Sequence, residues 1–107
     1  MFCYQCEQTS HGTGCRTVGV CGKTPEVAAL QDLLVEASKA IGQFAHRARR
    51  FDARDEAIDA FVLDALFTTV TNVNFDAARV DTMLAKAEIE RQRARDLYER
   101  AARAAGE

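Results

Sequence analysis

All four cysteines of this 107-residue chain lie within its first 21 residues, and this crowding constrains the fold more than any other feature. They are Cys3, Cys6, Cys15 and Cys21, spaced C-x2-C-x8-C-x5-C, and four of the six glycines fall in the same stretch of 23 residues. The apolar residues of this segment follow neither a helical nor a strand period. We therefore predict that residues 1–23 form a loop whose shape is set by something other than a hydrophobic core.

The composition of the chain bears on what these cysteines do. The 14 basic and 16 acidic residues give a net charge of −2, which argues against a dedicated nucleic-acid or anionic-membrane binder. No apolar run approaches the ~20 residues that span a bilayer, and the N-terminus has no secretory pattern of a basic region followed by an apolar one. We expect a cytoplasmic protein, where four clustered cysteines bind metal or do redox chemistry more often than they form disulfides.

The rest of the chain, residues 24–107, has the periodicity of amphipathic helices. Thr24-Pro25-Glu26 combines an N-cap threonine, a proline suited to the first helical position and a carboxylate near the positive end of the helix dipole. This start predicts a helix over about 25–49. Its expected core face holds Val27, Leu30, Leu34, Ala37, Ile41, Phe44 and Ala48.

Two further helices are predicted. The second is capped by Asp52 or Asp55 and ends near Thr71-Asn72; the third follows a turn at Asn74-Phe75 with Asp76 as its N-cap. Their expected core faces are Ile58, Phe61, Val62, Ala65, Leu66 and Thr69 on the second, and Val80, Leu84, Ala87, Ala94, Tyr98, Ala101 and Ala105 on the third, which Arg91 interrupts.

Short connections between three amphipathic helices favour antiparallel neighbours. We predict an all-α fold, a small antiparallel three-helix bundle that forms one domain with the N-terminal cysteine-rich cluster-binding loop. The third helix, at about 28 residues or ~42 Å, should overhang the second. Its Ala- and Arg-rich distal half is expected to be solvated or to contact a partner, either a second copy or a larger chain.

The cysteine spacing leaves the metal open. Iron–sulfur clusters typically take four thiolates, because soft anionic sulfur suits iron. Structural zinc also takes four cysteines, although usually from two short chelating turns, which the gap before Cys21 fits less well. A reactive C-x-x-C redox pair fits least, because Cys3 does not lie at a helix N-terminus that follows a strand.

Several stretches carry a family resemblance: MFCYQCEQT over residues 1–9, GTGC over 12–15, GVCGK over 19–23, LQDLL over 30–34 and ALFTTVTNVNF over 65–75. They resemble the amino-terminal part of hybrid cluster proteins, also called prismane proteins or hydroxylamine reductases. The resemblance implies that the four cysteines are ligands of the family's proximal cubane cluster. The spacing here looks like the [4Fe–4S] form, whereas a form with wider spacing is associated with [2Fe–2S].

In that family the cubane passes electrons to a second, hybrid iron–sulfur–oxygen cluster, where hydroxylamine or nitric oxide is reduced. Relatives are several times longer, and further cysteines, histidine and glutamate from later domains hold the hybrid cluster. This chain has no fifth cysteine, so the resemblance does not make it an enzyme by itself. It looks like the family's first helical domain, as a fragment or as a small protein in its own right.

Other residues near the cysteines have weaker assignments. Phe2 and Tyr4 are expected to shield a cluster or to pack on the end of the bundle. His11 has the chemistry to donate a hydrogen bond to a cluster or to replace a ligand, although a loop histidine is more often solvated. His46 lies among arginines at a helix end, where a cation complements the dipole. The acidic residues of the second helix converge with no histidine, and we assign them no catalysis.

Two functions follow from these patterns. The first is electron transfer, in which one [4Fe–4S] cluster takes an electron from a donor and passes it to an acceptor. The second is a non-catalytic assembly module, in which an iron–sulfur cluster or zinc fixes the fold and the third helix docks a partner.

Overall fold

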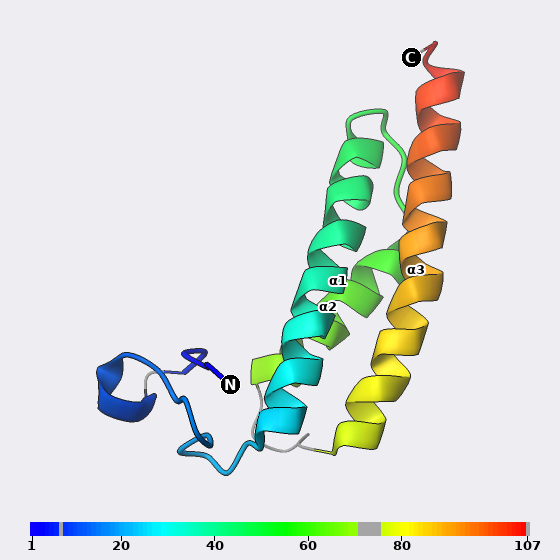
Figure 1. The fold of residues 1–107 in the computed structure, drawn as a ribbon. Coiled ribbons are helices and arrows are strands. Elements are labelled where there is room, and N and C mark those ends of the chain that lie inside the picture. Colours follow the sequence, from blue (N-terminus) through cyan, green and yellow to red (C-terminus); the bar gives the residue numbers. More distant parts are fainter. Residues whose placement is uncertain (7, 71–75, 107) are drawn as a thin grey trace.

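The computed structural model describes residues 1–6, 8–70 and 76–106, and for Val70 its backbone alone. A 3-10 turn, η1 (Ser10–Gly12), precedes three helices: α1 (Pro25–Arg49), α2 (Glu56–Val70) and α3 (Ala77–Ala104). Successive helices alternate in direction, so α1 and α3 run the same way, and the N-terminal loop lies at the end where α1 begins (Figure 1). The predicted three-helix bundle with a cysteine-rich N-terminal loop is confirmed.

Side-chain caps set the helix starts. The Val27 N–H donates to Thr24 Oγ1 at 3.2 Å, as expected for the predicted cap of α1. Asp55 rather than Asp52 caps α2, since the Ala57 N–H donates to Asp55 Oδ1 at 2.9 Å. Asp52 instead takes a left-handed φ of 61° in the turn between α1 and α2.

The predicted start of α3 is also confirmed. Asp76 Oδ1 accepts from the Ala78 N–H at 3.0 Å, one residue before the first helical position. The predicted end of α2 at Thr71-Asn72 and the turn residues Asn74 and Phe75 lie outside the described residues.

The core lies mainly between α1 and α3, which contact each other more extensively than either contacts α2. Alanines at two core positions of α3 let its backbone approach α1 closely. The buried core residues are Leu34, Ile41, Ile58, Phe61, Ala65, Val80, Ala87 and Ala94, and among the partly buried residues that pack against them are Leu30, Ala37, Phe44, Val62 and Leu84. The predicted core faces of α1 and of the first part of α3 are therefore confirmed.

The predicted face of α2 needs one correction. Leu66 is 41% exposed, whereas Thr68, which the periodicity left out, is buried. The Thr68 hydroxyl donates to the Asp64 carbonyl at 2.9 Å and lies 3.3 Å from Met83 Sδ, so its polar atom is satisfied inside the bundle. A short polar side chain can thus take a core position that the apolar pattern assigns to its neighbours.

The distal half of α3 also differs from its prediction. Its Ala- and Arg-rich composition suggested a solvated helix, but one face of it packs against the rest of the protein. The Tyr98 ring lies 6.3 Å from the rings of both Phe44 and Phe51, and Ala94 and Ala102 are buried. The third helix, α3, does extend beyond α2, and the end of α1 together with Phe51 after it packs against part of this extension (Figure 1). Ala105 is exposed and caps the end of the helix.

Gly42 offers a direct test of helix propensity in α1. An added Cβ at Gly42 meets no heavy atom within 4 Å outside the local helix backbone, and the residue lies well inside the helix. Gly42→Ala should therefore raise the free energy of unfolding by about 0.5–1 kcal/mol, measured by urea denaturation. Gly12→Ala is the matched control: it has equal space but a φ of 69°, so it should not stabilise. Equal effects of the two changes would contradict this account.

Within the described ranges, no helix is both long enough and apolar enough to cross a bilayer.

Candidate metal centre

Backbone pairing brings Cys3 and Cys15 opposite each other. The Cys3 N–H donates to the Cys15 carbonyl at 2.9 Å, and the Cys15 N–H donates back to the Cys3 carbonyl at 2.7 Å. The chain between them turns at η1, where the N–H groups of Thr13 and Gly14 both donate to the Ser10 carbonyl. The middle of the long C-x8-C gap is thus a compact turn that returns Cys15 to Cys3.

A second turn positions Cys21. The Gly19 N–H donates to the Lys23 carbonyl at 2.8 Å, and the Gly22 N–H donates to the Gly19 carbonyl at 2.8 Å. Gly22 has a φ of 95°, a left-handed conformation that suits glycine. This turn ends directly at Thr24, so the cap of α1 fixes its far side.

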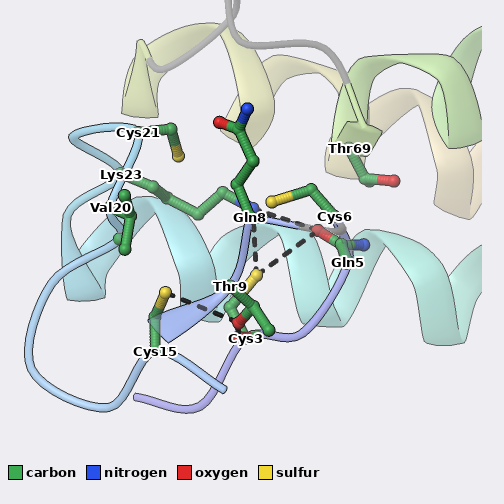
Figure 2. A pocket seen from close by; sticks show the side chains of 11 residues that line it. Cys3, Gln5, Cys6, Gln8, Thr9, Cys15, Val20, Cys21, Lys23 and Thr69 are labelled. Carbon is green, nitrogen blue, oxygen red and sulfur yellow. Dashed lines mark hydrogen bonds between the residues drawn. The ribbon is translucent and has the colours of Figure 1, made fainter. Parts of the chain in front are cut away.

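The two turns enclose a cavity of about 260 Å³ beside α2 (Figure 2). All four cysteines line it, and all four are free thiols. The other lining residues are Gln5, Gln8, Thr9, Gly19, Val20, Lys23 and Thr69. Cys15 is buried and Cys3 half-buried, whereas Cys6 and Cys21 are exposed. The structure therefore brings together the four residues that the spacing singled out.

The four thiols surround the cavity rather than converging on one point. Among the residues that the structure describes, no three Cys, His, Asp or Glu side chains are grouped closely enough to hold a metal ion between them. The space between the sulfurs is shared with the side chains of Gln8 and Lys23 (Figure 2).

Cys15 has the most developed polar environment of the four. The Ser10 N–H donates to Cys15 Sγ at 3.4 Å, and the Thr9 hydroxyl lies 3.6 Å from the same sulfur. Hydrogen bonds from the backbone of Ser10 and of Val20, together with the Thr9 hydroxyl, hold the pKa of the Cys15 thiol below its usual value, and Lys23 adds a smaller effect. These groups favour the thiolate, the form that binds metal.

Lys23 is a site residue that the sequence analysis did not identify. It is only 4% exposed, and its Nζ donates to Cys3 Sγ at 3.5 Å and to Gln5 Oε1 at 3.0 Å. A signal was present in the sequence, because a single glycine separates this lysine from the last cysteine. Thr69 was predicted as a core residue of α2, yet it also lines the cavity.

The neighbouring aromatic and histidine residues do not line the cavity. Phe2 and Tyr4 lie against each other with ring centroids 5.5 Å apart, Arg16 lies over the Phe2 ring, and Tyr4 is 70% exposed. Neither ring is among the side chains that line the cavity, and their expected shielding of a cluster or packing on the end of the bundle stays a prediction. His11 is exposed in η1, and His46 is exposed in the last turn of α1, which agrees with a solvated role for each.

Gly19 is held so closely against Lys23 that no larger residue fits. A Cβ at Gly19 would lie 2.9 Å from Lys23 Cβ, 3.1 Å from the Lys23 nitrogen and 3.2 Å from Cys21 Sγ. We expect Gly19→Ala to displace the turn that carries Cys21 and to lower the metal content of the purified protein severalfold. Metal analysis checks this, with Gly42→Ala as the control that should retain full content. Unchanged metal content in Gly19→Ala would show that this close approach is not needed.

Comparisons with known proteins place these features in a family context. The chain matches the Prismane/CO dehydrogenase family over residues 1–107. It is 58% identical over 101 residues to a hydroxylamine reductase of Rhodospirillum rubrum, covering 94% of this chain and 18% of that protein. It is 52% identical over 103 residues to a hydroxylamine reductase of Geobacter sulfurreducens, covering 96% and 19%. It is 47% identical over 110 residues to one of Acidithiobacillus ferrooxidans, covering 99% and 20%. The chain thus spans about a fifth of the length of these relatives.

Proposed function

Because the chain belongs to the prismane/CO dehydrogenase family, whose proteins bind iron–sulfur clusters, we propose that Cys3, Cys6, Cys15 and Cys21 hold one [4Fe–4S] cluster. The proposed function is one-electron relay. The observation that carries it is the single cavity that all four thiols line. A bound cluster of this kind supplies reversible one-electron transfer without binding a substrate.

The arrangement of the sulfurs favours a cluster over zinc. A tetrahedral zinc ion requires four sulfurs about 2.3 Å from one point. A cubane instead takes one thiolate at each of its irons, so the ligands are spread around a larger body. Thiols distributed around a cavity of about 260 Å³ suit the second geometry. Glycines at the lining turn allow the backbone to come close to such a body.

The residues around the thiols have defined tasks in this proposal. The Ser10 N–H donates to the Cys15 sulfur, which stabilises the thiolate and orients it, and the Thr9 hydroxyl oxygen lies 3.6 Å from the same sulfur. The Thr9 hydroxyl also donates to the Cys3 carbonyl at 2.9 Å, which ties the two ligand segments together. Cys6 and Cys21 are exposed, so their side of the cavity is where we expect a donor protein to approach.

The relatives are named hydroxylamine reductases, which suggests where the electrons go. Reduction of hydroxylamine to ammonia and water consumes two electrons and two protons, so a relay would act twice in each turnover. In our proposal the acceptor is a hybrid cluster outside this chain. The chain has four cysteines, and the relay cluster uses all of them, so none is left to hold a second cluster. This chain is then not a reductase by itself. The cytoplasmic location and the identities of the donor and acceptor proteins stay predictions.

Dithionite reduction of anaerobically purified protein, followed by EPR, tests the relay. We expect a signal that appears on reduction, integrates to about one spin per chain and disappears on reoxidation. A cluster that is present but cannot be reduced and reoxidised would contradict the relay while leaving the metal site in place.

The second candidate is the non-catalytic assembly module. Exposed apolar side chains favour it, since Leu63 and Phe67 of α2 and Ile89 of α3 are each more than half exposed. In this case the metal fixes the loop, and the helices dock a second copy or a larger reductase chain. Zinc in place of iron, together with self-association that rises with concentration in sedimentation experiments, would favour the module over the relay.

A further inference from the structure

We propose that Lys23 tunes the cluster, acting as a positioning residue whose buried ammonium group raises the cluster's reduction potential. The inference rests on the proposed [4Fe–4S] site and goes beyond it by assigning a role to a residue that is not a ligand. Its basis is the placement of Lys23 Nζ, which donates both to the ligand sulfur of Cys3 and to Gln5 Oε1.

The position of Lys23 is fixed at both ends of its side chain. At the backbone, its carbonyl accepts from the Gly19 N–H, and the close approach of Gly19 leaves its Cβ no freedom to move toward that turn. At the tip, Gln5 Oε1 accepts from Nζ at 3.0 Å. The ammonium group is therefore directed into the cavity and not toward solvent (Figure 2).

Lys23 is also distinctive in charge. Among the described residues that line the cavity, no other side chain apart from the thiols carries a formal charge. The other lining side chains are neutral amides, a valine and two threonines. The four thiolates would concentrate negative charge in this space, and a compact ammonium group is suited to offset it.

The direction of the effect follows from electrostatics. If a bound cluster took one electron from a donor, the donor would be oxidised by one electron, no bond would form or break, and the cluster with its thiolates would gain one negative charge. A cation nearby stabilises that more negative state more than the oxidised state. Burial strengthens the effect because the local dielectric is lower than that of water. A hydrogen bond to a ligand sulfur acts in the same direction.

Charge-neutral and charge-retaining variants of Lys23 test the proposal. Lys23→Met and Lys23→Gln remove the cation, Lys23→Arg keeps it, and Lys39→Met is the control. Lys39 lies on α1, is mostly exposed and pairs with Glu36 at 3.0 Å. Each protein is first assayed for iron, acid-labile sulfide and helix content, and its potential is then measured by EPR-monitored redox titration. We expect a lower potential in the Met and Gln variants and little change in Lys23→Arg and Lys39→Met.

Each outcome has a defined meaning. If Lys23→Met and Lys23→Gln hold a cluster whose reduction potential equals that of the parent protein, the tuning role is overturned and the proposed function stays intact. Loss of the cluster in both neutral variants with retention in Lys23→Arg would support the need for a cation. Loss of the cluster in all three Lys23 variants, Lys23→Arg included, would overturn the role of the charge. It would indicate that only the shape of the lysine side chain matters. A parent protein without iron or sulfide would refute the cluster site, and the inference with it.

Discussion

Cys15→Ala should remove the proposed cluster from the protein while leaving the helical bundle folded. Cys15 is 5% exposed, and its sulfur lies within hydrogen-bonding distance of the Ser10 N–H. Loss of contacts that merely orient a ligand typically weakens metal binding by about 10–100-fold, so loss of a thiolate ligand should cost at least that much. Iron and sulfide content should fall by about tenfold or more.

Two measurements separate this effect from unfolding. Cys15 is not part of the core shared by α1, α2 and α3, so the far-UV circular dichroism of Cys15→Ala should stay close to that of the parent. Val18→Ala is the loop control, because Val18 lies between Cys15 and Cys21, is exposed and does not line the cavity. Full iron content in Cys15→Ala would remove Cys15 from the ligand set.

Leu34→Ala should destabilise the bundle by about 2–5 kcal/mol, a cost typical of a leucine-to-alanine change in a closed core. Leu34 is 0% exposed and contributes to the core shared by the three helices. Domains of this kind are stable by only about 5–15 kcal/mol, so the change should remove a large part of the total. Urea denaturation followed by circular dichroism measures it.

The neighbouring residue supplies a matched control for this change. Leu33 is 58% exposed on the same helix, and leucine and alanine have similar helix propensities. Leu33→Ala should therefore change the free energy of unfolding by no more than about 0.5 kcal/mol. Similar losses in the two variants would mean that the core does not lie on the face assigned to it.

Much of the fold could be predicted from the sequence because local signals and apolar period agree. Thr24 and Pro25 specify the start of α1, and the residues spaced three and four apart after them are those that the core buries. The choice between Asp52 and Asp55 could not be made, because both are good caps and the left-handed turn at Asp52 depends on how α1 ends.

The packing of α3 was harder to predict because it depends on tertiary contacts. An Ala- and Arg-rich helix looks solvated when only its composition is considered. Tyr98 nevertheless fits between Phe44 and Phe51, which are separated along the chain by the end of α1. Only the parallel alignment of α1 with α3 brings these rings together.

The candidate site also has a part that could be predicted from the sequence and a part that could not. That the four cysteines lie around one cavity could be predicted, since thiols crowded into one short loop are typical of a metal site, whereas their role as ligands stays a prediction. Lys23 could not, because a lysine next to a helix start normally points into water. What buries it is the turn at Gly19 and the amide of Gln5, which come from separate segments of the loop.

The most direct test of the central claim is the iron and acid-labile sulfide content of protein purified and kept without oxygen. The account predicts about four irons and four sulfides per chain, as a [4Fe–4S] cluster on four thiolates requires. About one zinc per chain, with no sulfide even after anaerobic reconstitution, would contradict it and leave a structural metal site in a small helical bundle.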